Sequence, residues 1–197
     1  MLKKYIPVRS YTGEKWTTNP TNKKYLAIDF RNRCAYCDDL DYLYGGKRSF
    51  AVEHFAPKDK FPELKFTYDN LLYACPYCNG AKGNDWPSKS SKINIVNDCG
   101  YVDPCSEDYY KHLDRNEKTG EIFPTSKLGE YMYSHLNLGL VRHKILYMID
   151  KLNKEIADLE KSIESDKSNG LDADRKQELL NVLDREFRKY YCELQTC

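Results

Sequence analysis

The chain has 197 residues, 41% hydrophobic and 31% charged, a composition typical of folded domains and unlike that of disordered chains. No stretch approaches the roughly 18 uninterrupted apolar residues of a membrane span, and the basic start MLKKYIPVRS lacks the apolar run of a signal peptide, so we expect a cytoplasmic location. The net charge of +1, taken alone, argues against a nucleic-acid partner.

The distribution of charge along the chain is less even. Residues 1–33 carry eight Lys or Arg residues against Glu14 and Asp29, which suits a basic arm that faces a polyanion, although a solvated charged face is the simpler alternative. The segment NPTNKKYLAIDFRNR predicts a helix from about Asn22 to Arg31 that runs into the first cysteine pair. Four basic residues would then lie near that pair and bind phosphate without reading sequence: Lys23, Lys24, Arg31 and Arg33.

Two C-x2-C pairs come next, with 37 residues between them. They are Cys34-Ala-Tyr-Cys37 and Cys75-Pro-Tyr-Cys78. A single pair could be a redox motif or two unrelated buried cysteines, but two pairs in a reducing compartment favour a tetrahedral zinc site. Four thiolates close the coordination shell, so this zinc is expected to be structural. The remaining cysteines are expected to be ordinary thiols: Cys99, Cys105, Cys192 and Cys197.

The segment between the pairs predicts a small β unit. Apolar runs at residues 42–44 and 49–53 flank Gly45 and Gly46, which predicts a β-hairpin with the glycines in the turn. The second run ends in Glu53 and His54, and burying a carboxylate or an imidazole without a partner is costly, so we expect something to meet them.

A short helix is expected at the second cysteine pair. Asp69 or Asn70 is a candidate cap for a helix that carries Leu71, Leu72 and that pair. Two glycines, Gly80 and Gly83, indicate that any such helix is short or interrupted.

The second half of the chain predicts helices. An irregular connector from Asp98, with a turn at Thr119-Gly120, leads to helices at about 126–135, 140–165 and from Asp172 onward, with Gly170 as a cap. The last two carry apolar residues at steps of three and four, which predicts an antiparallel helical hairpin or a surface that docks another subunit. These residues are Ile145, Ile149, Leu152, Ile156, Leu159 and Ile163, then Leu179, Leu183, Phe187, Tyr190 and Leu194. Surface or packing roles are expected for the other histidines, His112, His135 and His143.

The segments CAYC, VEHFAPK, NLLYACPYCN and AKGN, within roughly residues 30–85, closely resemble the HNH nuclease family. The resemblance implies a ββα-metal core, often braced by a four-cysteine zinc. It implies that His54 is the general base that activates water and that Glu53 is a ligand of a catalytic Mg2+ or Mn2+ ion. Asn70 matches the residue that holds the loop of the base, although it could equally be a helix cap. Asn79 stands at the third motif position as a further catalytic residue and metal ligand, giving an H-N-N variant.

The chemistry of phosphodiester hydrolysis requires the same residue types. A neutral histidine can accept a proton from water at cellular pH, and a hard cation prefers the oxygen ligands that Glu53 and Asn79 offer. Lys58 follows the histidine and Lys82 lies one helical turn beyond Asn79, so both are candidate phosphate contacts, with Asn84 a weaker one.

The segments YVDPCSEDYYKHL, GEIFPTS and LNLGLVRHK also resemble, more loosely, Septu-type and retron-associated PtuB-like HNH nucleases, which are encoded beside ATPases in bacterial anti-phage systems. This resemblance implies a PtuA-like ATPase partner that contacts the C-terminal helices. The chain itself lacks the G-x4-G-K-[ST] motif of P-loop ATPases.

We therefore expect an α+β fold with a zinc-stabilised ββα-metal core followed by a mainly α-helical region. Residues 1–98 would hold the basic arm and the nuclease core, and residues 99–197 the connector and the helical hairpin, a partner or homo-oligomer contact. The expected function is metal-dependent endonuclease cleavage of nucleic acid, DNA in the first instance, by nicking or double-strand cleavage, in anti-phage defence. The alternative is a non-catalytic zinc-finger module that binds nucleic acid or serves as an adaptor in a larger complex.

Overall fold

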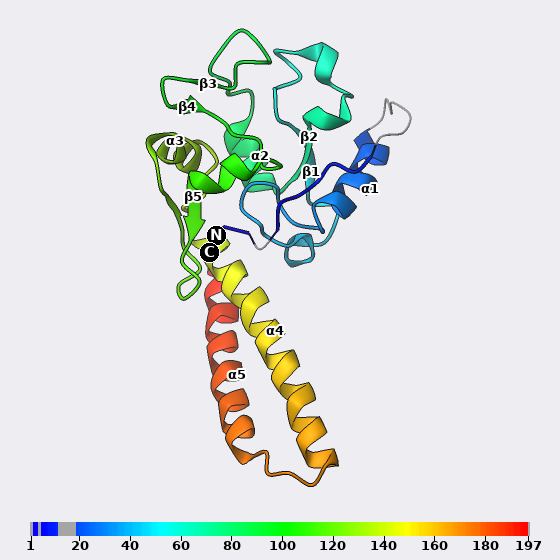
Figure 1. The fold of residues 1–197 in the computed structure, drawn as a ribbon, viewed down its shortest axis with the longest axis vertical. Helices are drawn as coiled ribbons and strands as arrows, with labels where there is room; N and C mark the ends of the chain where they lie inside the picture. Colours follow the sequence, from blue (N-terminus) through cyan, green and yellow to red (C-terminus); the bar gives the residue numbers. More distant parts are fainter. Residues whose placement is uncertain (1, 4, 12–18, 197) are drawn as a thin grey trace. The chain divides into compact units, whose positions relative to one another are not determined.

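The structure is a computed structural model of the chain, and it describes residues 2–3, 5–11 and 19–196 (Figure 1). The basic-arm residues Lys4 and Lys15, and the acidic Glu14, lie outside the described residues. The chain divides into two compact units. The first comprises residues 1–117 and 121–140, and the second comprises residues 118–120 and 141–197.

The first unit opens on helix α1 (Asn19–Asp29), which confirms the predicted N-terminal helix with its end two residues earlier. Leu26 is fully buried in the core, as is Phe30, the residue that follows the helix. Arg31 and Asn32 then adopt left-handed conformations, with φ of 53° and 57°, which turn the chain out of the helix and toward the first cysteine pair.

Strand β1 (Ala51–His54) pairs antiparallel with strand β2 (Leu71–Ala74), with Glu53 opposite Leu72. The predicted β-hairpin before His54 is therefore wrong, because residues 42–44 belong to a 3-10 helix, η1 (Asp41–Tyr44). Gly45 ends this turn in a left-handed conformation with φ of 97°. A fully buried apolar run, Leu71–Ala74, is the better partner for β1, because it extends the sheet into the core.

The predicted helix carrying Leu71 and Leu72 is also wrong, since both residues lie in β2. Helix α2 (Pro76–Lys82) begins inside the second cysteine pair instead, with Cys75 as its N-cap and Pro76 at its first position. Proline disrupts a helix interior but is favoured at the first turn, so a helix could start there and not run through it. The order β1, β2, α2 is the expected ββα arrangement (Figure 1).

The connector after residue 98 is more regular than predicted. It begins within a small sheet formed by β3 (Ile95–Val96) and β4 (Cys99–Gly100), and it contains a second formed by β5 (Leu113–Arg115) and β6 (Ile122–Pro124). The predicted turn at residues 119–120 joins β5 to β6. Short 3-10 helices η2 (Pro62–Leu64), η3 (Tyr68–Asn70) and η4 (Glu107–Lys111) precede helix α3 (Lys127–His135). This helix lies close to the predicted bounds, and the Ser126 hydroxyl caps its first turn.

One apolar core runs through the first unit and joins the cysteine region to the connector. Tyr109, in η4, is fully buried and donates a hydrogen bond to the carbonyl of Tyr36, 3.0 Å away, between the first two cysteines. The proposed domain boundary after residue 98 therefore falls inside a compact unit that continues to residue 140.

The second unit is an antiparallel hairpin of helices α4 (Val141–Ser168) and α5 (Asp174–Leu194), close to the predicted bounds (Figure 1). Gly170, with φ of 69°, lies in the connection as expected. Ile149 and Leu152 of α4 are buried, whereas the predicted seam residue Leu179 of α5 is 50% exposed. No helix in the described part of the chain is both long enough and apolar enough to cross a bilayer.

Candidate active site and cysteine cluster

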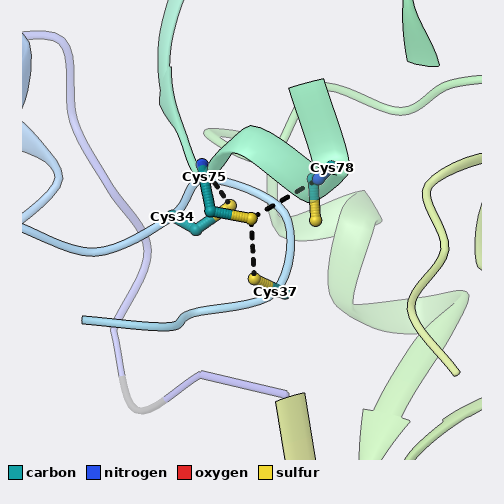
Figure 2. A group of neighbouring side chains, drawn as sticks. All are labelled: Cys34, Cys37, Cys75 and Cys78. Atoms are coloured by element: carbon teal, nitrogen blue, oxygen red, sulfur yellow. Dashed lines mark hydrogen bonds between the residues drawn. The ribbon is translucent and has the colours of Figure 1, made fainter. Parts of the chain in front are cut away.

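The two cysteine pairs converge at one point in the first unit. Figure 2 shows Cys34, Cys37, Cys75 and Cys78, all fully buried, with their sulfur atoms within 4.8 Å of one another. The Cys37 and Cys75 sulfurs are 3.7 Å apart, and the described cysteines are free rather than disulfide-bonded. A tetrahedron with metal–sulfur bonds of about 2.3 Å has sulfur–sulfur edges of about 3.8 Å, so the donor set fits zinc.

Backbone amides also point at these sulfurs. The amide of Cys78 donates to the sulfur of Cys75, and the amide of Cys75 donates to the sulfur of Cys34, each at 3.4 Å. The first of these contacts is the N-cap bond of α2, so the start of this helix is tied to the cluster. Such amide donors stabilise thiolates, the form of cysteine that binds a metal.

Two side chains that the sequence did not single out bind the backbone of the first cysteine pair. The Lys3 ammonium donates to the carbonyls of Cys34 (3.1 Å) and Ala35, and the Arg115 guanidinium donates to the carbonyl of Cys37 (2.7 Å). Both cations are buried. A zinc ion with four thiolates carries a net charge of −2, which two buried cations offset. No sequence motif marks these residues.

A cleft of about 660 Å³ opens on the same unit, above strand β1. Its walls include Glu53 and His54 at the end of β1 and Asn79 on α2. The structure thus brings together the predicted base and both predicted ligands of the catalytic metal. They come from elements that are connected through β2, which pairs with β1 and ends at Ala74, directly before Cys75, the N-cap of α2.

His54 is only 5% exposed, and its ring is oriented by one clear contact. Its Nε2 atom lies 3.0 Å from the carbonyl oxygen of Lys65. A carbonyl only accepts, so Nε2 carries the proton and the lone pair is on Nδ1. Burial lowers the pKa of His54 below its ordinary value, against the opposing effect of the Lys65 carbonyl. The neutral form that can accept a proton is therefore favoured.

Glu53 is 6% exposed and forms a buried ion pair. Its Oε1 atom lies 2.9 Å from the Lys82 ammonium, which also donates to the carbonyl of His54 at 3.1 Å and lies 5.3 Å from the centre of the Tyr101 ring. Burial raises the pKa of Glu53, and the charge of Lys82 opposes that rise. The side chain of Lys82 is fully buried in this ion pair, which does not support its predicted contact with phosphate. Its four-carbon stem crosses from α2 into the core.

Asn70 clamps the backbone that follows His54. The Ala56 amide donates to its Oδ1 at 2.8 Å, and its Nδ2 donates to the Ala56 carbonyl at 3.0 Å and to the Leu64 carbonyl at 3.4 Å. Asn70 does not cap a helix, because β2 follows it directly. Its amide is used entirely to hold the loop beside the histidine.

Comparison with known proteins agrees with this geometry. Residues 34–85 match the family model described as HNH endonuclease. Over this segment the chain is similar to HNH endonucleases. Septu protein PtuB from Bacillus thuringiensis is 41% identical over 63 residues, 32% of this chain and 24% of that protein. Septu protein PtuA from Bacillus mycoides (strain KBAB4) is 27% identical over 145 residues, 64% of this chain and 20% of that protein. The chain spans about a quarter or less of the length of these curated relatives.

Some of the basic residues near the segment that matches the HNH model line the cleft, and others do not. Lys58 is exposed and lines the cleft, as does Asn84, whose amide donates to Asp59 at 2.8 Å. Arg31 lies over the Tyr5 ring, 4.2 Å from its centre, and is not among the described residues that line the cleft.

Arg33 is absent from the described cleft lining as well. Its guanidinium lies 3.5 Å from the Asp38 carboxylate and donates to the Asp38 carbonyl at 3.0 Å. Lys23 and Arg48 do line the cleft. Arg48 was missed by the sequence analysis, although its position three residues before the strand that carries Glu53 and His54 was the available signal.

Proposed function

We propose that the protein is a metal-dependent endonuclease that hydrolyses phosphodiester bonds of DNA. The observation that carries the proposal is that Glu53, His54 and Asn79 line one cleft of an HNH domain. The three residues supply a proton acceptor and oxygen donors, the groups that this hydrolysis needs.

In the proposed mechanism His54 accepts a proton from the attacking water at Nδ1. The Lys65 carbonyl, bound to Nε2, holds the ring in this tautomer and stabilises the imidazolium that forms. Asn70 fixes the loop after the histidine through Ala56, which supports an orienting role. Lys82 holds both the Glu53 carboxylate and the backbone of His54, so it is a positioning residue.

The donor set of the cleft fits a hard divalent cation. The carboxylate of Glu53 and the amide oxygen of Asn79 would hold Mg2+ or Mn2+, which prefer oxygen ligands. When bound, such an ion stabilises charge that develops on the phosphate and the leaving oxygen. The resemblance to HNH nucleases implies products with 5′-phosphate and 3′-hydroxyl ends, and a single site cuts one strand at a time. The four cysteines would hold a structural zinc that supports α2.

The similarity to the Septu proteins supports a role in anti-phage defence. The resemblance implies a PtuA-like ATPase partner at the helical hairpin, where Leu179, Val182 and Tyr191 of α5 are exposed. A homo-oligomer is the other expected contact. The cytoplasmic location stays a prediction, supported by the free buried thiols.

A plasmid nicking assay with titrated Mg2+ tests the metal assignment. Wild-type protein should nick supercoiled plasmid in Mg2+ or Mn2+ and stop when the free ion is chelated. Glu53→Gln and Asn79→Ala should raise the Mg2+ concentration needed for half-maximal nicking at least tenfold, since each removes an oxygen donor. Asn84→Ala is the matched control, because Asn84 lines the same cleft without a proposed ligand role. Zinc content must stay equal in all four proteins.

Two outcomes would count against the proposal. Nicking that needs no divalent ion, or that is unchanged in Glu53→Gln, would contradict the metal assignment. Wild-type protein that binds plasmid in Mg2+ and Mn2+ without nicking it would favour the alternative, a non-catalytic zinc-finger or adaptor module.

A further inference from the structure

The cleft carries more positive charge than the catalytic residues need. Among the described residues that line it are three cations, Lys23, Arg48 and Lys58, and one carboxylate, Glu53. The Glu53 carboxylate already has the buried Lys82 as its counter-ion. The three cleft cations are therefore not neutralised by the acid that shares the cleft with them, and they attract an anionic ligand.

The cations come from three separate segments that flank β1. Arg48 precedes the strand, Lys58 follows it, and Lys23 comes from α1. The Lys23 ammonium donates to the backbone carbonyl of Arg48 at 3.4 Å, so these two cations belong to the same end of the strand. At about 3.3 Å per residue, β1 spans about 10 Å from Ala51 to His54.

Cations beyond both ends of a strand about 10 Å long suit a linear polyanion. One DNA strand advances 3.4 Å along the helix axis per nucleotide, so about 10 Å corresponds to about three nucleotides. The lining of the cleft is rich in charged and amide side chains, whereas small-molecule pockets are mostly apolar. A phosphodiester backbone therefore fits the cleft better than a small metabolite does.

We propose that Lys23, Arg48 and Lys58 form a backbone-binding site for a DNA strand that lies along β1. Lys58 contacts the phosphate nearest to His54, and Lys23 and Arg48 contact phosphate about three nucleotides away. This inference rests on the proposed nuclease function and names the residues that hold its substrate. Contacts of this kind position the strand without reading its bases.

The test measures equilibrium binding of a fluorescent 20-base-pair duplex as a function of salt, without divalent metal. All proteins carry His54→Ala, so that cleavage does not disturb the measurement. The cleft variant combines Lys23→Gln, Arg48→Gln and Lys58→Gln. The matched control combines Lys47→Gln, Lys60→Gln and Lys89→Gln, which removes the same charge at lysines that are exposed and outside the described cleft lining.

Each lost phosphate contact should reduce the slope of log K against log salt by about 0.9, and the cleft variant by about 2.7. At 0.1 M salt this corresponds to weakening of about 8-fold for each contact and about 500-fold for all three, taking each contact as neutral at 1 M. The control should lower the slope by less than 1. Circular dichroism and zinc content establish that both variants are folded.

Three results would overturn the inference: equal slopes in the cleft variant and its parent, an equal reduction in the control, or no duplex binding by the parent at about 50 mM salt. Plasmid nicking by the wild-type chain shows whether such a result refutes only the backbone-binding site or also the proposed nuclease function. If wild-type protein nicks plasmid in Mg2+ while the cleft variant keeps the parent slope, the backbone site is wrong and the nuclease assignment stands. If the slope falls as expected but wild-type protein does not nick, the cleft binds DNA without cutting it.

Discussion

Lys82→Met should destabilise the first unit strongly, because it leaves the Glu53 carboxylate buried without its cation. The Lys82 side chain is fully buried, the Glu53 side chain is 7% exposed, and the two charges are 2.9 Å apart. Removing one partner of such a pair costs about 3–5 kcal/mol of unfolding free energy, since the other charge stays desolvated. Methionine keeps most of the volume of the side chain, so the loss is chiefly electrostatic.

The loss of unfolding free energy in Lys82→Met should depend on pH. Burial already raises the pKa of Glu53, and without Lys82 that pKa rises further. The native state then binds the proton more tightly than the unfolded chain does, so the free energy of unfolding falls as the pH rises above the ordinary range of a glutamate. Below that range Glu53 is protonated in both states and the penalty disappears. The variant should therefore lose more stability at pH 8 than at pH 5.

Urea unfolding of zinc-loaded protein, without added divalent metal, measures the effect. Glu53→Gln/Lys82→Met should recover most of the loss, because no unpaired charge remains, and Lys89→Met, at an exposed lysine, should change stability by less than about 0.5 kcal/mol. A loss below about 1 kcal/mol in Lys82→Met, or one that is equal at pH 5 and pH 8, would refute the reasoning.

Three further changes test the packing around the site. Cys75→Ser should abolish binding of about one zinc per chain and unfold the first unit, since structural zinc contributes about 10–16 kcal/mol in zinc-finger peptides. Cys99→Ser, at an exposed thiol, should keep the metal. Zinc retained by Cys75→Ser would contradict this prediction. Asn70→Ala should cost about 1–3 kcal/mol for each buried Ala56 group left without a partner, and unchanged urea unfolding would argue against the clamp. Gly129→Ala should lower the free energy of unfolding by about 1–3 kcal/mol, because its added carbon would lie 2.0 Å from the His112 carbonyl oxygen. The added carbon of the control, Gly80→Ala, meets nothing within 4 Å. Equal melting temperatures of the two variants would count against this account.

The cysteine spacing made the four-cysteine cluster predictable from the sequence. Two C-x2-C pairs leave few other interpretations, and the structure brings all four sulfurs together. The helical hairpin was predictable for a related reason, because 28 and 21 residues of apolar periodicity in α4 and α5 give a strong helical signal. Long periodic segments and metal-ligand spacing are local patterns, so a single sequence carries them.

The pairing of β1 could not be predicted in the same way. The run Leu71–Ala74 is equally compatible with a strand or a buried helix, and only the packed core decides between them. The partner of Glu53 was missed for a similar reason. Lys82 looks like a surface lysine in the sequence, and its burial follows from where α2 meets β1. Contacts between segments distant in sequence are set by tertiary packing and leave no local signal.

The contacts that Lys3 and Arg115 make with the first cysteine pair also could not be predicted, because they join residues still further apart in the sequence. Lys3 and Arg115 reach the first cysteine pair from positions 31 and 78 residues away from their acceptors. The HNH match ends at residue 85, yet Arg115 and Tyr109 hold its first turn. We therefore expect the HNH segment to need the connector for its stability.

Nicking of supercoiled plasmid by wild-type protein and by His54→Ala, in Mg2+ and with equal zinc content, tests the central claim most directly. His112→Ala is the matched control, since its ring nitrogen contacts Ser126 in the connector, away from the cleft residues. The account predicts nicking by wild type and by His112→Ala, and a loss of at least a hundredfold in His54→Ala, because a positioned base contributes about 10²–10⁴ in rate. Equal nicking by His54→Ala and wild type would contradict the assignment of His54 as the base.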